Sequence, residues 1–227
     1  MTGRSIRTGA KLLASALLLA AAPARAADDV AQVWYATLAT GPIAGKTLIW
    51  LEGQARIGEA PQRQRQFILR PAIGRQIGRT TQIHAGYAYV PTGTAARLRD
   101  EHRFWQQIAF RIVRTDRIQL LGRSRIEQRL FSGEDMSWRL RQQIRANLPL
   151  GGKDGVSLVL WSEGFFNLNA PAPRFRTGID RWRNQIGLNI PVTRSISFEP
   201  GYLNQYVRRR GEDAMDHIFW SQLVIRL

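Results

Sequence analysis

The sequence of 227 residues predicts an all-β protein, an antiparallel up-and-down transmembrane β-barrel of about ten strands, with twelve as the next count. Three observations lead to this fold class. The chain begins with an export signal, ten later segments alternate apolar and polar residues, and the connections between them alternate in length.

The first 26 residues have the pattern of a cleaved secretory signal peptide. Arg4, Arg7 and Lys11 precede the apolar run LLASALLLAAA, and PARA precedes the expected cleavage site after Ala26. The run is shorter than the roughly 20 apolar residues of a membrane-spanning helix, although a short N-terminal anchor is the alternative. We therefore predict export to the outer membrane of a Gram-negative bacterium and one domain over residues 27–227.

Ten segments alternate with a period of two, so that each would place its apolar side chains on one face of a strand. In order along the chain, these segments are 46–58, 65–76, 80–90, 101–113, 118–131, 138–148, 156–168, 180–192, 195–207 and 217–227. Residues 31–39 alternate too, and they are either a further strand or a segment tucked against the barrel, because bacterial barrels have even counts. Pro71 and Pro200 interrupt two segments, and we expect both to form bulges.

The connections and the aromatic residues favour a membrane barrel over a soluble one. Short connections such as GRT, TDR and TRS alternate with longer ones such as PTGTAARLRD and RRRGEDAMD, as expected for periplasmic turns and extracellular loops. The chain ends in the alternating stretch LVIRL. Near the strand ends we expect interfacial girdles, formed by Trp50, Tyr87, Tyr89, Phe104, Trp138, Trp161, Phe165, Phe166, Trp182, Tyr202, Phe219 and Trp220.

Arginine rows indicate a polar interior. The formal net charge is +16, only three of the 33 basic residues are lysine, and WRLRQQIRANL (138–148) places several arginines on one strand face. Arginine facing lipid at the membrane midplane costs about 2–4 kcal/mol, so these rows must face the lumen. We predict a lumen charge network of Glu52, Arg56, Glu101, Arg103, Arg111, Arg123, Arg125, Glu127, Arg129, Arg139, Arg141, Arg145, Glu163, Arg183 and Glu199.

The motifs EHRFWQQ, SRIEQRLF, RLRQQI and GYLNQY resemble those of a bacterial outer-membrane family, domain-of-unknown-function family 2490. The similarity runs over nearly the whole chain after the signal peptide. It implies a barrel, but the family brings no established activity, so no functional residue follows from it. The charged residues within the matching motifs are Glu101, Arg103, Glu127, Arg129, Arg139 and Arg141.

The partners follow from charge and export. Basic residues are spread along an exported chain, so we expect no nucleic acid but outer-membrane lipids, including lipopolysaccharide, and the barrel-assembly machinery during insertion. Arginine clusters at 174 and 176 and at 208–210 could contact lipopolysaccharide. The chain has no cysteine, and we expect no cofactor and no metal. The oligomeric state is left open.

Four functions remain open. The first is a structural envelope protein or a narrow, anion-preferring, porin-like channel, and the second is a binder of lipopolysaccharide. The third is an outer-membrane enzyme acting on lipid or peptide at the extracellular rim, for which the candidates are His84, His102 or His217 with Asp213, Asp216, Ser124 or Ser137. No catalytic residue is assigned. The fourth is a soluble periplasmic lipocalin-like barrel with an apolar ligand, because alternation fits both orientations of the wall.

Overall fold

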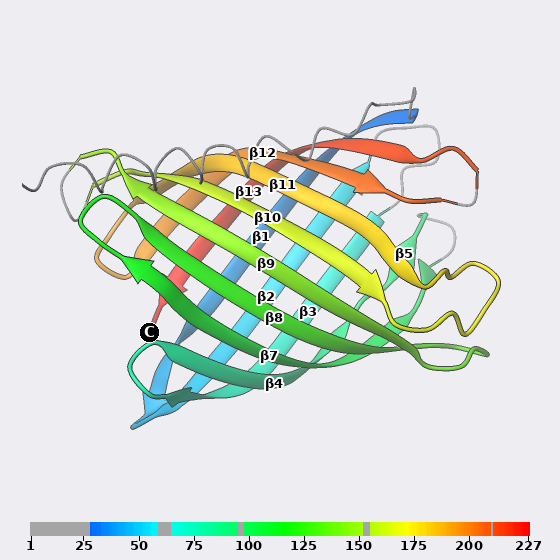
Figure 1. The fold of residues 1–227 in the computed structure, drawn as a ribbon, viewed down its shortest axis with the longest axis horizontal. Coiled ribbons are helices and arrows are strands. Elements are labelled where there is room, and N and C mark those ends of the chain that lie inside the picture. Colours follow the sequence, from blue (N-terminus) through cyan, green and yellow to red (C-terminus); the bar gives the residue numbers. More distant parts are fainter. Residues whose placement is uncertain (1–27, 59–64, 95–97, 152–154, 210) are drawn as a thin grey trace, which may run out of the picture.

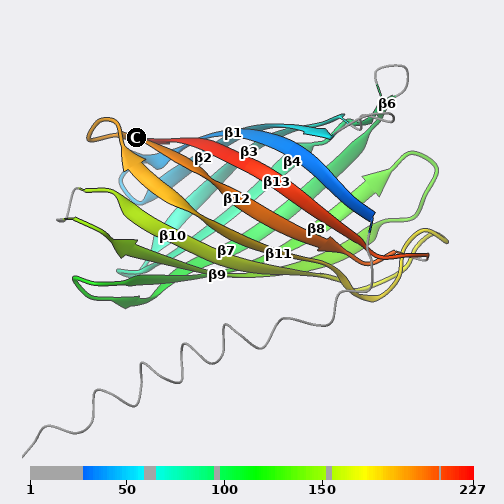
Figure 2. The ribbon, with the colours of Figure 1, turned by 90° about the horizontal axis from the view of Figure 1, so that it is seen from above.

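The computed structural model describes residues 28–58, 65–94, 98–151, 155–209 and 211–227, which form one closed β-barrel (Figures 1 and 2). The expected signal peptide lies outside these residues. Eleven long strands build the barrel within the described chain: β1 (Asp28–Ala44), β2 (Thr47–Gly58), β3 (Arg65–Ile77), β4 (Thr81–Tyr89), β7 (Glu101–Arg114), β8 (Gln119–Phe131), β9 (Ser137–Pro149), β10 (Ser157–Asn167), β11 (Gly178–Pro191), β12 (Ile196–Val207) and β13 (Ala214–Arg226). Two short strands, β5 (Thr92–Gly93) and β6 (Leu98–Arg99), belong to the connection between β4 and β7.

The barrel closes through a parallel pair. Each long strand pairs antiparallel with the next one along the chain, whereas β1 and β13 pair in parallel from Asp28–Ala214 to Thr40–Arg226. An odd number of alternating strands leaves the first and the last running in the same direction. The start of β1 and the C-terminus therefore lie at opposite ends of the barrel (Figure 1).

The predicted fold class is confirmed, and the strand count of eleven falls between the two counts expected from sequence. Residues 31–39 belong to strand β1 and are not tucked against the barrel. The expectation of an even count treated every neighbouring pair as antiparallel, and the parallel seam removes that requirement.

The two mid-strand prolines do not form bulges. Pro71 pairs opposite Leu51, and Pro200 pairs opposite Ser221, each without a shift of register. On the other side of each proline the ladder lacks paired residues but resumes in the same register. The register shifts that do occur lie at 42/44, 111/113 and 165/166. The missing proline donor is thus accommodated by a local gap in the ladder.

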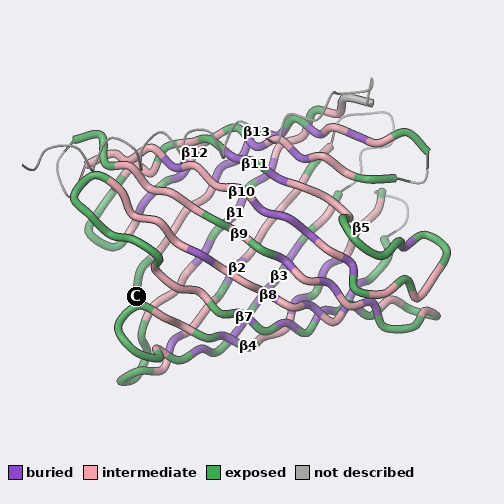
Figure 3. The backbone as a smooth tube through the Cα atoms, in the orientation of Figure 1, coloured by how far each residue is buried: buried purple, intermediate pink, exposed green. Residues whose placement is uncertain are grey.

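Polar side chains face inward and apolar side chains face outward. In β9, Arg139 and Arg141 are buried, whereas Ile144 on the opposite face is 56% exposed. The alternation of buried and exposed positions is visible along the strands in Figure 3. This facing is that of a transmembrane barrel and excludes the soluble lipocalin-like alternative, in which the arginines would face water. No helix in the described ranges is long and apolar enough to cross a membrane.

Several aromatic residues do not join the expected girdles. The side chains of Trp50, Trp161, Phe165 and Trp220 point into the barrel and contact the lumen cavities. Trp34 packs edge-on against Trp220 with ring centroids 6.3 Å apart. The girdle prediction was wrong for these four because strand position alone does not say which face a residue occupies.

The two halves of the barrel carry matching sequence motifs on corresponding strands. The pattern W-x-E-G occurs at 50–53 in β2 and at 161–164 in β10, and R-x-x-I-G occurs at 70–74 in β3 and at 183–187 in β11. Gly-Tyr recurs in β4 and β12, and an acid followed by H-x-F-W-x-Q recurs at 101–107 in β7 and at 216–222 in β13. The chain therefore contains an internal repeat.

Two runs of five long strands make up the repeat, β1–β7 and β9–β13, and β8 joins them. Corresponding residues face the same way: Glu52 and Glu163 are both buried on the lumen side, and so are Arg70 and Arg183. A single joining strand between two five-stranded units gives eleven strands, which accounts for the parallel seam.

Candidate functional site

The structure places the side chains of the predicted lumen charge network inside the barrel. Most are buried, including Arg125 and Glu127 at 1% exposure each, and the others border the lumen cavities. Charged lumen residues that sequence reasoning missed include Arg70, Asp180, Arg181 and Asp216. The internal repeat could have identified Arg70, because it occupies the position of Arg183 in the first half.

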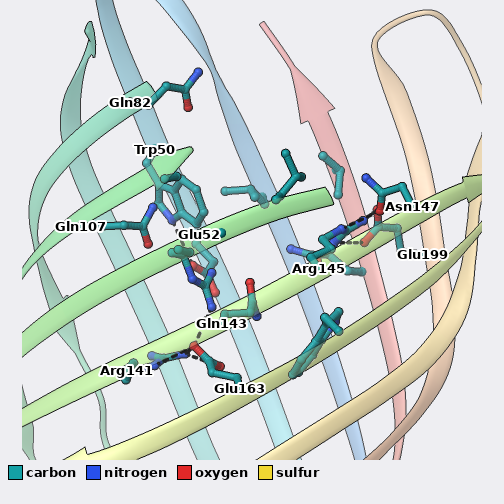
Figure 4. A pocket seen from close by; sticks show the side chains of 18 of the residues that line it. Trp50, Glu52, Gln82, Gln107, Arg141, Gln143, Arg145, Asn147, Glu163 and Glu199 are labelled. Atoms are coloured by element: carbon teal, nitrogen blue, oxygen red, sulfur yellow. Dashed lines mark hydrogen bonds and ion pairs between the residues drawn. The ribbon is translucent and has the colours of Figure 1, made fainter. Parts of the chain in front are cut away.

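The centre of the network is a ladder of ion pairs across β8, β9 and β10. Arg141 donates to both Glu127, at 2.8 Å, and Glu163, at 2.9 Å. Arg139 donates to Glu127 at 2.6 Å, and Arg123 donates to Glu163 at 2.7 Å. Each carboxylate thus receives two arginines, and Arg141 joins the two groups. Figure 4 shows Arg141 beside Glu163. Such pairing compensates the cost of burying charge in the barrel.

Three further carboxylates tie the rest of the wall together. Glu52 accepts from Arg70 at 2.7 Å across β2 and β3, and Glu101 accepts from Arg103 and Arg129. Toward the other end, Glu199 of β12 accepts from Arg145 of β9 at 2.6 Å, which spans the lumen between strands that are not neighbours (Figure 4).

Arg56 and Arg183 are lumen arginines without a carboxylate partner within the described chain. Arg56 donates to Gln54 and Gln66, and Arg183 donates to Gln205. Both guanidinium groups lie against the indole of Trp34, with Cζ atoms 3.9 and 4.9 Å from its ring centroid. Cation–π contacts and hydrogen bonds to glutamine side-chain amides hold these two cations without neutralising their charge.

The repeat explains why Arg183 is unpaired. Arg70 stands opposite Glu52 in the β2–β3 ladder, and Arg183 stands opposite Glu163 in the β10–β11 ladder. In the first half this register produces the ion pair. In the second half Glu163 accepts from Arg123 and Arg141 instead, and Arg183 makes no ion pair with it.

Two cavities occupy the lumen, one toward each end. The larger, of 490 Å³, reaches the short-turn end, and the smaller, of 220 Å³, reaches the long-loop end. Ten of the fifteen residues around the smaller cavity are arginine, and Glu101 is the one carboxylate among those fifteen. Both cavities border Arg56, Arg70, Arg141 and Arg183, which therefore stand between them.

A clasp of three charged residues crosses the long-loop end. Arg99 and Arg174 both bond to the carboxylate of Glu134, and Arg174 also lies over the ring of Phe131. Burial alone would raise the pKa of Glu134, but its bonds to the two arginines outweigh that effect and hold the pKa below its usual value. Burial and the charge of Arg99 lower the pKa of Arg174. The clasp joins three separate connections above the smaller cavity.

The enzyme candidates do not form a catalytic arrangement. His102 faces outward and bonds to the hydroxyl of Tyr87, whereas Ser137 is fully buried on the lumen side. Ser124 also faces outward, but in β8 it is Leu130, and not Ser124, that stands opposite His102. The Ser124 hydroxyl donates a hydrogen bond to the side chain of Gln142.

The remaining enzyme candidates are also separated. Asp216 is buried in the lumen while the neighbouring His217 faces outward against Tyr202, and Asp213 bonds to Tyr206 instead of a histidine. His84 is buried against Trp50. Among the described residues, no group of three potential metal ligands occurs.

The arginine clusters of the loops before β11 and before β13 lie side by side. Arg176 donates to the backbone oxygen of Arg209, and the amide of Arg208 donates to the backbone of Asp180. Arg210 lies outside the described residues. The loops before β11 and before β13 therefore present one basic surface.

Comparison with known proteins identifies relatives and similar folds. An uncharacterised protein of Methylorubrum extorquens is 37% identical over 228 residues, which cover 97% of this chain and 99% of that protein. Among solved structures, LpxR from Salmonella typhimurium superposes with a TM-score of 0.48 at 7% identity, over 78% of this chain and 83% of that one. The siderophore receptor PirA from Pseudomonas aeruginosa gives a TM-score of 0.29 at 13% identity, over 73% of this chain and 32% of that one. The sequence profile of the proteins of unknown function DUF2490 matches residues 31–216, and the chain belongs to this family.

Proposed function

We propose that this protein is a narrow, anion-preferring barrel of the bacterial outer membrane. Its apolar outer wall and charged interior support a location in lipid, and the residues before β1 have the pattern of an export signal. Membrane lipids, including lipopolysaccharide, are then its immediate partners, and the barrel-assembly machinery would insert it.

One observation carries the anion preference. Arg56 and Arg183 stand between the two lumen cavities, on Trp34, without a carboxylate partner in the described chain. A buried guanidinium without a counter-charge is costly, and a small anion entering the lumen would supply that charge. Rings of arginine favour anions in pores for the same reason.

The ion-pair ladder sets the width of the proposed path. The lumen beside the two unpaired arginines is occupied by the side chains of Arg141, Glu127 and Glu163. Only small ions could therefore pass without breaking these ion pairs. Large paired side chains narrow a barrel of this size. A purely structural envelope protein is the alternative, and it differs in carrying no current.

Electrophysiology tests the proposal. Purified barrel, shown to be folded by a band that shifts between unheated and boiled samples, is placed in a planar bilayer under a KCl gradient. We expect small currents whose reversal potential is displaced from zero toward the equilibrium potential of chloride. The double variant Arg56→Gln/Arg183→Gln should lose this preference, whereas Arg194→Gln on an exposed turn should keep it. Folded protein without current, or with a preference for potassium, would exclude an anion path.

A further inference from the structure

The outer wall carries a stripe of uncharged polar residues across five neighbouring strands. Gln106 of β7, Ser124 of β8, Gln142 of β9, Ser162 of β10 and Asn184 of β11 all lie near the middle of their strands and face outward. We call these five residues the polar stripe. It lies where the wall of a transmembrane barrel is expected to be apolar.

At the repeat positions of Ser162 and Asn184, the first half of the barrel carries no polar side chain. The repeat pairs Ser162 with Leu51 and Asn184 with Pro71, whereas the neighbouring Trp and Glu of W-x-E-G are the same in both halves. Leu51 and Ile73 of the first half are exposed apolar residues, at 46% and 65%. The two halves thus share the inward residues of W-x-E-G and differ in the outward residues at these two positions.

Hydrogen bonds within the stripe leave some polar groups unsatisfied. The Ser124 hydroxyl donates to the Gln142 side-chain oxygen at 2.7 Å, and the Ser162 hydroxyl donates to the Asn184 side-chain oxygen at 2.8 Å. Trp182 in turn donates to Ser162 at 2.9 Å. The amide nitrogens of Gln142 and Asn184 then have no acceptor in the described chain. Lipid tails offer none either, so these groups require a partner of another kind.

We propose that the polar stripe is the contact face between two copies of this chain. Amide side chains both donate and accept, so the stripe is complementary to itself when one copy is turned by a twofold axis. Polar side chains that bond across membrane-embedded interfaces stabilise association in lipid. Ile144 and Ile186 beside the stripe are exposed at 56% and 50%, and they would surround the polar contacts with apolar packing.

Single-cysteine cross-linking tests this contact directly, because the chain has no cysteine of its own. Ile144→Cys places one thiol beside Gln142 without altering the stripe. Leu51→Cys, the repeat position of Ser162, places one on the outer wall of the first half. Each variant is oxidised in vesicles of purified protein and in native outer membranes, after its unheated band has shown that the barrel is folded.

We expect Ile144→Cys to give a disulfide-linked dimer at a yield several times that of Leu51→Cys, in both preparations. Adding Gln142→Leu and Asn184→Leu to Ile144→Cys should reduce the dimer to the level of the Leu51→Cys control. Equal yields at both sites, no dimer at either, or a product of Ile144→Cys with another protein only in native membranes would each overturn the proposal.

Discussion

Arg183 stands directly opposite Glu163 in the β10–β11 ladder, yet it is Arg123 and Arg141 that bind this carboxylate. The corresponding pair in the first half, Arg70 and Glu52, does bond, at 2.7 Å. The difference arises from β8 and β9, which bring two further arginines to Glu163. Cross-strand position therefore does not decide which arginine binds which carboxylate in this lumen. The numbers of arginines and carboxylates that come within reach of one another decide it.

Glu163→Gln should destabilise the barrel strongly. The substitution leaves Arg123 and Arg141 buried with one carboxylate fewer, and removing one partner of a buried ion pair typically costs about 3–5 kcal/mol. The temperature at which the folded band is lost on unheated electrophoresis should fall well below that of the parent. Glu212→Gln, on an exposed loop, changes the charge equally and should leave that temperature unchanged. Equal effects of the two variants would contradict the ladder.

The facing of β9 predicts opposite outcomes for two substitutions of one residue, Leu140. Leu140 lies on the outer wall, and Leu140→Arg would place a cation in lipid at a cost of about 2–4 kcal/mol, so assembly into membranes should fail. Leu140→Phe, which keeps the position apolar, should assemble. The amount of protease-resistant barrel in the membrane fraction measures both, and normal assembly of Leu140→Arg would mean that this face of β9 does not meet lipid.

The alternation of the sequence predicted which side of each strand is charged, because a row of arginine at every second residue has one tolerable side in a membrane. It could not predict which arginine binds which carboxylate. Arg145, for example, reaches Glu199 from a strand that is not a neighbour of β12. The contact between Arg145 and Glu199 depends on barrel closure, and closure depends on β1. The sequence left residues 31–39 open as a strand or a tucked segment, because an even strand count was expected.

The lumen tryptophans were mispredicted for a related reason. Trp50 and Trp161 lie in segments whose alternation places Glu52 and Glu163 inward, so the same period puts both tryptophans inward too. The general enrichment of aromatic residues at membrane interfaces outweighed this local rule in the sequence reasoning. The repeated W-x-E-G pattern was the available signal for an inward aromatic residue next to an inward acid.

Acidification should open the clasp over the smaller cavity. The pKa of Glu134 is lowered in the folded protein, so its contribution to loop stability is fully present above the unfolded pKa and is lost as the pH falls through the folded value. Hydrogen exchange at the Glu134 amide, which bonds to the backbone oxygen of Phe131, should lose protection in acid. Glu134→Gln, compared at each pH, should show low protection throughout. A parent protein whose protection does not change with pH relative to this variant would exclude the clasp.

Close packing of backbone strands predicts that two repeat-related glycines cannot be replaced. A Cβ on Gly86 would collide with the backbone oxygen of Pro71 and with Ala72, and a Cβ on Gly201 would collide with the backbone oxygen of Ile186 and the amide of Gln185. Backbone atoms in a hydrogen-bonded ladder cannot move aside as a flexible side chain can.

Gly86→Ala and Gly201→Ala should therefore each lower the temperature at which the folded band is lost, by forcing neighbouring strands apart. Gly53 of β2 provides the matched control, because a Cβ there meets nothing within 4 Å and the backbone is not in the left-handed region. Gly53→Ala should fold as the parent does, and it should gain slightly from the reduced freedom of its unfolded chain. If Gly53→Ala were as damaging as the other two, the cost would come from a general intolerance of alanine in these strands, and the close approach at Gly86 and Gly201 would not be its cause.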